Sequence, residues 1–396
     1  MFLETLKSRN PALLQAAVAL HQSGELPANT FVLDLDAISA NAAVIAAEAS
    51  RLGLTVFAMT KQIGRNPDVS RALIAAGIEA SVAVDMACAK TTVAAGMELG
   101  HIGHLVQVPR AEAIAAAYLK PHNWTVFDDT KATEAAQASE RVGRDQRLLA
   151  RIQHTGDEFY SGHEGGYEAD DIAAVADRLD ALPGAHFGGI TTFPALVFDG
   201  TGNTVRRTTN LETLERAATV LRDAGRTDLQ INAPGTNSTI MLQALADAGA
   251  TQVEPGHALT GTTPLHAVRG DLPEIPAVCY LSEVSHFAGG RAYCFGGGMY
   301  VDPVFPPYQE RALVGSDPTD LHELNADLPP ATAIDYYGQL EPEGHLVEPG
   351  DSVVFGFRIQ AFVTRGYTAA VSGISTGKPH VEGIYTVDAT RTTWPY

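Results

Sequence analysis

Lysine, cysteine and long apolar runs are scarce in this chain of 396 residues. No stretch approaches the roughly 20 apolar residues that a membrane-spanning helix needs, so we expect no membrane partner. The three cysteines, Cys88, Cys279 and Cys294, argue against a disulfide scaffold and are typical of a reducing compartment. The first residues also lack the basic-then-apolar order of a signal peptide. These features together predict a cytoplasmic protein.

Positive charge is scarce as well, because the formal net charge is −19 at pH 7. A nucleic-acid-binding surface needs cationic groups that neutralise phosphates, so we expect no nucleic-acid partner. The chain contains 45% hydrophobic and 18% charged residues, which is the balance of a globular protein with a substantial core. At roughly 100–200 residues per domain, the length suggests about two or three domains.

Between about residues 30 and 265, short apolar or β-branched runs alternate with Ala-rich stretches of helical period. We interpret eight of these runs as buried parallel strands. They are Thr55–Thr60, Ala80–Asp85, Gly103–Val108, Trp124–Asp128, Arg147–His154, His186–Phe193, Asp228–Asn232 and Thr251–Glu254. Eight strand–helix units in this length favour a (β/α)8 TIM barrel over an open sheet.

The helical rhythm stops after about residue 270, where prolines become frequent. Runs such as Ser352–Phe357 and Gln360–Thr364 indicate strands there. The predicted fold class is therefore α/β, with a TIM barrel in residues 1–270, which includes an N-terminal helix. A C-terminal all-β domain is expected in residues 271–396.

Residues that follow barrel strands are candidates for an active site, because TIM barrels carry their sites at the C-terminal strand ends. Lys61 ends the first run and is one of only six lysines. A lysine at such a place can lose its charge and attack a carbonyl group, or it can be an ordinary solvated charge. The turn 235–238 follows the seventh run and offers backbone N–H groups to an anion. Glu254 enters a second glycine-containing turn after the eighth run.

An amine, an anion-binding turn and a carboxylate at one end of a barrel suit pyridoxal 5′-phosphate (PLP), which has an aldehyde, a phosphate and a ring nitrogen. A barrel enzyme that uses the same turns for a phosphorylated substrate, without PLP, is the alternative.

Five segments carry a resemblance to a known family. They are residues 59–67, 103–109, 232–234, 254–261 and 293–298. Taken together they resemble the fold-type III PLP-dependent enzymes, the superfamily of alanine racemases and of ornithine and diaminopimelate decarboxylases. Within that superfamily the chain is most similar to the YhfX-type branch of alanine racemase-like proteins. The similarity extends over nearly the whole chain, and each segment alone is weak.

The resemblance implies a Schiff-base lysine at Lys61 and a homodimer with active sites shared between subunits. It also implies a set of cofactor-binding residues: Lys61, Arg65, Thr192, Asn232, Gly235, Thr236, Asn237, Ser238, Glu254, Gly256 and His257.

Three departures from alanine racemases affect the expected chemistry. Glu254 stands where those enzymes have an arginine opposite the pyridine nitrogen, as in the decarboxylases. A carboxylate there favours a protonated ring, which is a stronger electron sink and also permits decarboxylation or β-elimination. Thr192 replaces a histidine near the ring. Arg65 replaces a tyrosine near the phosphate, so it contacts the phosphate or a substrate carboxylate, or lies on the surface.

Racemisation needs an acid or base on each face of a planar carbanion. Lys61 can serve one face, and the resemblance implies that the partner's β domain supplies the other. The candidates are Glu283, His286, Cys294 and Tyr336. Tyr336 lies close to where the decarboxylases have an essential cysteine, and the absence of a cysteine there argues against an ordinary amino-acid decarboxylase. Cys294 has an alternative role as a buried strand thiol.

No metal is expected. His101 and His104 flank the start of the third run and could form a metal pair. Related metal enzymes, however, use a histidine and a cysteine near the C-terminus. Here that region offers His345 and His380 but no cysteine.

The predicted function is a PLP-dependent amino-acid racemase or epimerase, an isomerase that acts on a small amino acid through Lys61. A PLP-dependent decarboxylase or lyase is the alternative among enzymes. A non-catalytic PLP-binding or regulatory protein is the alternative of another class.

Overall fold

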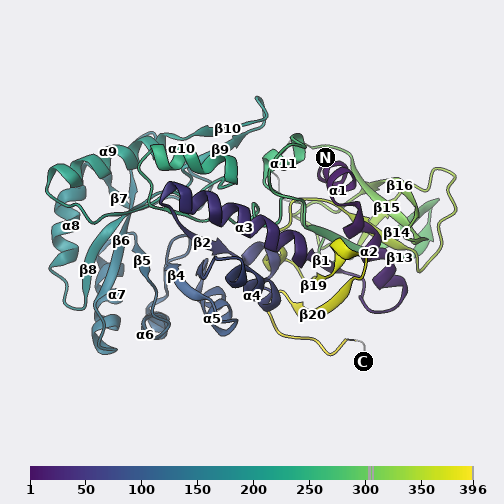
Figure 1. Ribbon diagram of the computed structural model, residues 1–396, viewed down its shortest axis with the longest axis horizontal. Helices are drawn as coiled ribbons and strands as arrows, with labels where there is room; N and C mark the ends of the chain where they lie inside the picture. The colour runs from purple at the N-terminus through teal and green to yellow at the C-terminus, as the bar shows by residue number, and fades with distance from the viewer. Residues whose placement is uncertain (302–304, 306, 395–396) are drawn as a thin grey trace. The chain divides into compact units, whose positions relative to one another are not determined.

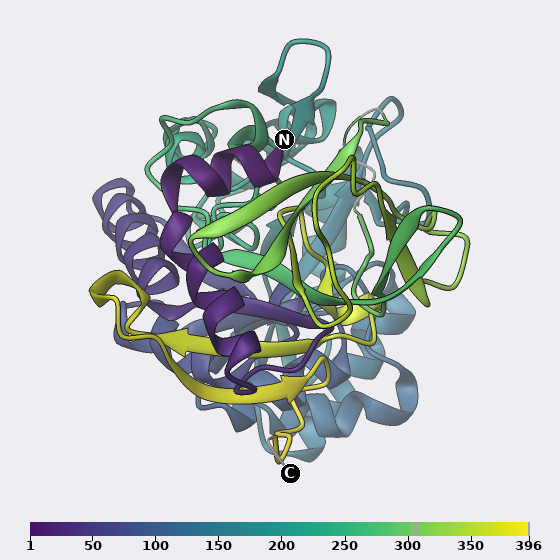
Figure 2. The same cartoon turned by 90° about the vertical axis from the view of Figure 1, so that its right-hand side faces the viewer.

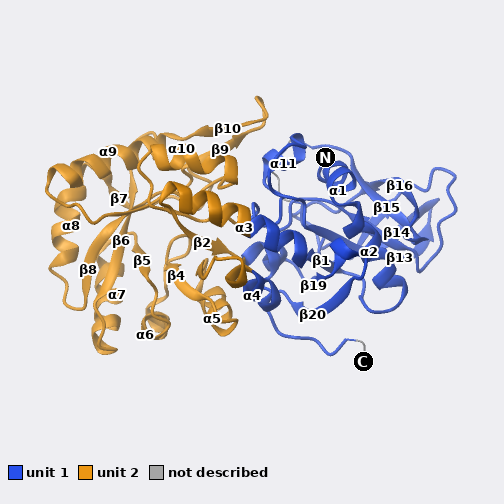
Figure 3. Cartoon of the chain, viewed as in Figure 1, with its two compact units in different colours: residues 1–42, 61–72, 257–396 blue, residues 43–60, 73–256 orange. Residues whose placement is uncertain are grey.

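The chain forms two compact units in a computed structural model that describes residues 1–301, 305 and 307–394 (Figures 1 and 3). Unit 1 comprises Met1–Ala42, Lys61–Ala72 and His257–Tyr396, and unit 2 comprises Ala43–Thr60 and Leu73–Gly256. The expected division at residue 270 differs from this one, because the N-terminal 42 residues and two further segments go with the C-terminal sheet.

Unit 2 contains the barrel. Its strands are β2 (Thr55–Met59), β3 (Ala80–Val82), β4 (Glu98–Ile102), β5 (Asn123–Val126), β6 (Gln146–Gln153), β8 (Ala185–Thr191), β11 (Gln230–Asn232) and β12 (Gln252–Val253). They are parallel, follow the order β5-β4-β3-β2-β12-β11-β8-β6, and close by pairing of β5 with β6. The predicted TIM barrel is confirmed.

Helices alternate with these strands. They are α3 (Leu35–Leu52), α4 (Pro67–Ala75), α5 (Met86–Ala94), α6 (Ala113–Tyr118), α7 (Asp129–Arg141), α8 (Ile172–Asp180), α9 (Thr209–Asp223) and α10 (Leu242–Asp247). Side-chain caps fix several helix starts. Asp85 accepts a hydrogen bond from the Cys88 N–H at 2.7 Å, and Asp128 accepts one from the Lys131 N–H at 2.8 Å.

Shorter elements fill the remaining connections of unit 2. They are β7 (Tyr167–Glu168), which pairs with β6, the hairpin of β9 (Leu196–Asp199) and β10 (Thr204–Arg207), and the 3-10 turns η2 (Arg110–Glu112), η3 (Ala169–Asp171) and η4 (Thr239–Met241).

The predicted third strand, Gly103–Val108, is wrong. Strand β4 ends at Ile102, and Gly103 turns the chain with φ 79°. A side chain at Gly103 would meet the Thr125 carbonyl oxygen at 2.4 Å, so only glycine fits. Strand β4 was not predicted because Gly100 and His101 interrupt the apolar pattern of a buried strand. His101 therefore lies inside a barrel strand, and His104 lies in the loop after its C-terminal end.

Unit 1 contains the second sheet. Its strands are β1 (Thr30–Asp34), β13 (Val278–Ala288), β14 (Arg291–Phe295), β15 (Glu310–Asp317), β16 (Asp320–Asp327), β17 (Tyr337–Leu340), β18 (Ser352–Phe355), β19 (Tyr367–Ser372) and β20 (His380–Thr386). Six of them form a closed antiparallel ring in the order β14-β17-β16-β15-β18-β13, because β13 also pairs with β14. The predicted C-terminal all-β fold is confirmed. The predicted strand Gln360–Thr364 is wrong, because this segment forms the 3-10 turn η5 (Ala361–Val363).

The N-terminal residues complete this sheet. Strand β1 pairs antiparallel with β13 and parallel with β19. Helices α1 (Phe2–Arg9) and α2 (Pro11–Gln22) precede it, and buried residues of α2 share a core with β13 and β18. Figure 2 shows these purple helices against the green and yellow strands. Helix α11 (Pro264–Val268) and the turns η1 (Lys61–Ile63) and η6 (Ile374–Thr376) complete unit 1. Within the described ranges, no helix is long and apolar enough to cross a membrane.

Candidate functional site

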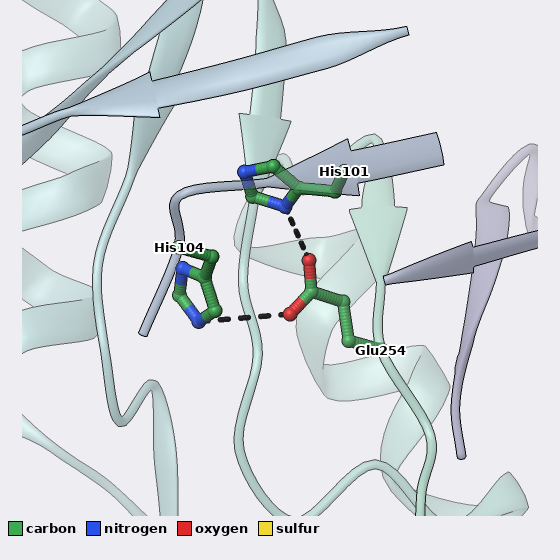
Figure 4. A group of neighbouring side chains, drawn as sticks. All are labelled: His101, His104 and Glu254. Atoms are coloured by element: carbon green, nitrogen blue, oxygen red, sulfur yellow. Dashed lines mark hydrogen bonds and ion pairs between the residues drawn. The ribbon is translucent and has the colours of Figure 1, made fainter. Parts of the chain in front are cut away.

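Glu254 is the centre of a buried polar cluster in unit 2 (Figure 4). It follows β12 directly, and its backbone N–H donates to Asn237 Oδ1 at 2.9 Å. Its Oε1 atom accepts a hydrogen bond from Asn232 Nδ2 at 2.9 Å and lies 2.5 Å from His101 Nδ1. Asn232 is itself fixed by the Thr191 hydroxyl, which donates to Asn232 Oδ1 at 2.8 Å. The carboxylate is therefore held by side chains from two neighbouring strand ends and from β4.

His101 and His104 approach the two oxygens of this carboxylate separately. His101 uses both ring nitrogens, because its Nε2 lies 2.6 Å from Thr125 Oγ1. His104 Nε2 lies 3.6 Å from Glu254 Oε2, and the two imidazole rings are 5.2 Å apart. All three side chains are at most 1% exposed. Oε2 makes no hydrogen bond among the described residues.

The same three side chains are a candidate cation site, since one ligand atom of each lies within 4.8 Å of the others. Two ligands of one zinc ion, each about 2.0–2.2 Å from it in a tetrahedral arrangement, lie more than 3 Å apart. The 2.5 Å separation of His101 Nδ1 and Glu254 Oε1 is instead that of a hydrogen bond. The observed geometry is therefore that of a hydrogen-bonded network.

The turn after β11 brings further predicted residues to the same barrel end. Gly235 passes so close to β9 that a Cβ atom would lie 2.7 Å from the Leu196 carbonyl oxygen. Part of the expected anion-binding backbone is engaged internally, because the Thr236 N–H donates to Leu196 O and the Asn237 N–H to Gly235 O. The Ser238 hydroxyl is buried and has no hydrogen-bond partner among the described residues. The Ser238 hydroxyl is thus an open donor of this turn.

Thr192 presents a second such hydroxyl, after β8. It is fully buried, and its Oγ1 also has no partner in the part of the chain that the structure describes. Buried hydroxyls are normally hydrogen-bonded, and an exception calls for a ligand or water. Gly256, the last residue of unit 2, ends the turn that Glu254 begins.

Arg151, on β6, ties together three loops at this end of the barrel. Its guanidinium donates to the carbonyl oxygens of His104 (3.3 Å), His163 (2.9 Å) and Phe193 (3.3 Å). It also lies over the Phe127 ring at 5.0 Å. Burial lowers the pKa of Arg151 to about 10, so it remains a cation at neutral pH. The imidazole rings of His104 and His163 both pack on Phe193.

Lys61 and His257 belong to unit 1. Lys61 follows Thr60, the first residue after β2, and its Nζ lies 5.0 Å from the centre of the Phe362 ring. His257 donates from Nε2 to the Ile359 carbonyl oxygen at 2.9 Å. Burial lowers the pKa of His257 well below its usual value, and the positive charges of Arg358 and Lys61 lower it further. The ring is thus neutral.

Arg65 is also in unit 1 and is buried rather than on the surface. Its φ of 56° places the backbone in the left-handed region, and its Nε has no hydrogen-bond partner among the described residues.

The four candidates for a second acid or base have separate environments in the sheet of unit 1. Glu283 lies 3.1 Å from His21 Nε2, and His21 Nδ1 lies 2.7 Å from the buried Ser352 hydroxyl. Cys294 is fully buried on β14, and burial raises the pKa of its thiol to about 12. That environment agrees with the alternative role of Cys294 as a buried strand thiol.

His286 and Tyr336, in contrast, are exposed. The His286 ring stacks on Tyr293 at 4.7 Å and meets the Tyr337 ring edge-on at 5.1 Å. Tyr336 is 66% exposed. Of the four candidates, these two are the ones open to a partner.

The structure also shows residues that the sequence analysis did not place in the site: His101 as a partner of Glu254, with Thr125 behind it, and Arg151. The misplaced third strand hid His101. A signal for Arg151 does exist, because it is the one charged residue between Leu148 and Ile152, where the other residues are apolar.

Comparisons with known proteins agree with this fold. The alanine racemase N-terminal domain matches residues 33–264, and the YhfX-like C-terminal domain matches residues 279–381. The chain is 38% identical to the protein YhfX of Escherichia coli (strain K12) over 97% of its own length and 98% of that protein. The chain therefore belongs to the alanine racemase-like family, in its YhfX-type branch.

Solved structures of three proteins share the fold at low sequence identity. D-threonine aldolase from Filomicrobium marinum has a TM-score of 0.68 at 18% identity, covering 92% of this chain and 96% of that one. D-threo-3-hydroxyaspartate dehydratase from Delftia sp. HT23 has a TM-score of 0.65 at 17% identity, and the match covers 90% of this chain and 97% of that one. Alanine racemase from Clostridium difficile 630 has a TM-score of 0.64 at 13% identity, and the match covers 90% of this chain and 98% of that one. The fold is thus shared by a racemase, an aldolase and a dehydratase.

Proposed function

We propose that this protein is a PLP-dependent enzyme that acts on a small amino acid, with PLP attached to Lys61. The observation that carries the proposal is the environment of the Glu254 carboxylate. Its carboxylate is buried at the C-terminal end of the barrel, with one oxygen held by Asn232 and His101 and the other without a hydrogen bond. A carboxylate oxygen of this kind can accept a hydrogen bond from a protonated ring nitrogen.

The residues present fit the cofactor in three further ways. The Ser238 and Thr192 hydroxyls are buried without partners among the described residues, which suits donors to the polar groups of a cofactor. The close approach of Gly235 to Leu196 leaves no room for a side chain at that position of the turn. Thr60, the residue before Lys61 in the chain, follows β2 at the same end of the barrel as Glu254.

PLP, when bound, supplies a ring that stabilises negative charge at the substrate Cα. Lys61 Nζ would hold the cofactor and carry a proton to or from one face of Cα. Glu254 would keep the ring nitrogen protonated. A second proton carrier on the other face makes the enzyme a racemase or epimerase, and this is the reaction we propose first.

A carbon–carbon or carbon–oxygen lyase is the second candidate, and Glu254 favours it. A carboxylate in place of an arginine retains the ring proton and strengthens electron withdrawal, which cleavage at Cα or Cβ uses as readily as racemisation does.

The visible spectrum of the purified protein, with PLP added, tests the cofactor assignment. We expect absorbance near 420 nm, a property of the cofactor, that borohydride abolishes, together with a matching mass increase on the peptide that contains Lys61. Lys61→Ala should lack both signals. Lys90→Ala, which removes an exposed lysine paired with Glu112, is the matched control and should keep them. A wild-type protein that stays colourless and unmodified would contradict the proposal.

Proton NMR in D2O with a panel of L- and D-amino acids distinguishes the two reactions. A racemase exchanges the Cα proton without a second product, and chiral chromatography of the same sample then detects the opposite enantiomer. A lyase releases an aldehyde, a keto acid, or carbon dioxide and an amine. Absence of both exchange and product across the panel, with PLP bound, would instead indicate a non-catalytic PLP-binding protein.

We also propose that the active form is a homodimer in which the partner supplies the second acid or base, with exposed Tyr336 or His286 as the leading candidates. Mixing Lys61→Ala with Tyr336→Phe subunits tests this, because a random mixture should recover about 25% of wild-type activity if sites are shared. Recovery should fail if each subunit is self-sufficient. If Tyr336 takes no part, Tyr336→Phe alone keeps its activity, and His286→Ala then replaces it in the test.

A further inference from the structure

The two oxygens of the Glu254 carboxylate are not equivalent. Oε1 is close to two nitrogen atoms, Asn232 Nδ2 and His101 Nδ1. Oε2 makes no hydrogen bond among the described residues, and its nearest ionic neighbour is His104 Nε2 at 3.6 Å. The network therefore fixes the side chain through one oxygen and leaves the other available.

The hydrogen positions follow from the chemistry of the groups. A carboxylate can only accept hydrogen bonds, so His101 Nδ1 carries the proton of the 2.5 Å contact. The Thr125 hydroxyl lies 2.6 Å from Nε2 and can donate to that nitrogen when it carries no proton. In that arrangement Thr125 favours the tautomer of His101 that donates to Glu254 from Nδ1.

We propose that His101 is a positioning residue: with Asn232, it holds Glu254 by Oε1 so that Oε2 faces a ligand nitrogen that bears a proton. This inference rests on the proposed function, in which that nitrogen is the ring nitrogen of PLP. It goes further because it assigns the preference for a ring N–H to His101. This residue lies on β4, which is three strands away from β12 in the order of the barrel.

The test compares two ligands that differ only at this atom. One is PLP, and the other is its 1-deaza analogue, in which a C–H group replaces the ring nitrogen. Both keep the aldehyde and the phosphate, so those contributions cancel in the ratio of the two dissociation constants. Titration of the apo-protein, followed by the change in intrinsic fluorescence, measures each constant without any need for turnover.

The wild-type protein should prefer PLP by about 10- to 100-fold, the factor expected for one charge-assisted hydrogen bond. His101→Gln should reduce this preference to about threefold or less, because its amide reaches the position of Nε2 and leaves Oε1 with Asn232 as its one remaining donor among the described residues. His101→Asn places an amide N–H near the position of Nδ1 and should retain most of the preference. Affinity for the deaza analogue should be the same in all three proteins.

Thr125→Val provides a milder variant if His101→Gln fails to fold. It removes the hydroxyl that favours this tautomer, keeps a similar volume, and should lower the preference for PLP several-fold.

The possible failures are distinguishable. If the wild type binds neither ligand, the proposed function itself is wrong. If it binds both equally, or if His101→Gln keeps the full preference, PLP binding stands and the positioning role is overturned. If the apo-protein instead binds one Co²⁺ with a visible spectrum that His101→Gln and His104→Ala both abolish, the cluster is a metal site and the positioning role is likewise overturned.

Discussion

The barrel end of unit 2 and the sheet of unit 1 hold their polar side chains in different ways. At the barrel end, Glu254, Asn232 and His101 come from separate strands and hydrogen-bond to one another in a buried cluster. In unit 1, Glu283 pairs with a helix residue and Cys294 is enclosed, whereas His286 and Tyr336, the residue before β17, are exposed. Parallel strands of a barrel all end at one place, whereas a closed antiparallel ring distributes its side chains over both faces and both ends. A site assembled within one chain is therefore expected in the barrel, and the sheet can contribute mainly through its exposed residues.

The largest expected effect of breaking this cluster follows from Glu254→Gln. The amide keeps the shape but loses the charge, so activity should fall about 10²- to 10³-fold, as when an electrostatic group acting on the transition state is removed. Steady-state kinetics with the substrate found in the NMR screen measures the loss. Glu283→Gln, the same change in the sheet, should cost less than about threefold. Equal losses in the two variants would remove the distinction between the regions.

Arg151→Met should give the largest loss of stability. It removes the donors to three loop carbonyls and leaves them buried, so we expect the free energy of unfolding to drop by about 2–4 kcal/mol. Urea denaturation of the apo-protein measures this. Arg178→Met, which removes an exposed ion pair with Asp129, should cost at most about 1 kcal/mol. A similar loss in both variants would contradict the role assigned to Arg151.

The pH dependence of stability is expected to depend on His257. Because its folded pKa is lowered, the unfolded chain binds its proton first, below about pH 6.5. Stability should therefore fall as the pH decreases through this value, by up to about 1.4 kcal/mol per pH unit from this group alone.

His257→Gln keeps a donor for the Ile359 carbonyl and cannot be protonated. Urea denaturation at pH 7 and pH 5 should show a smaller decrease for the variant than for the wild type. An identical decrease would mean that His257 does not make the expected contribution.

The smallest effect on stability is expected for Tyr336→Phe, because an exposed hydroxyl contributes less than about 0.5 kcal/mol. Thermal unfolding checks this value. If activity nevertheless falls by more than about tenfold, this exposed residue of the sheet serves a site, which is what a shared dimeric site requires.

The sequence allowed the barrel, most of its helices and the residues after its strands to be predicted, because buried parallel strands have a simple apolar pattern. Glu254 and the turn 235–238 were singled out by their place after barrel strands, and the resemblance added Asn232. His101 was misplaced, since a strand that contains glycine and histidine does not match that pattern. The segment 360–364 is apolar, like a strand, yet its hydrogen bonds are those of a turn. Strand β1 was missed because its partners lie far away in the sequence.

That last feature has a consequence for the synthesis of the protein. Strand β1 is complete after 34 residues, but Asp34 pairs with Val371, about 340 residues later. At the ribosome, about 5–20 residues are added per second. The first strand and the apolar sides of α1 and α2 must therefore remain without their final partners for roughly 20–70 s. A nascent chain of this kind is a natural client for chaperones, and loss of its last 30 residues would leave the first 34 without one of the two strands that flank β1.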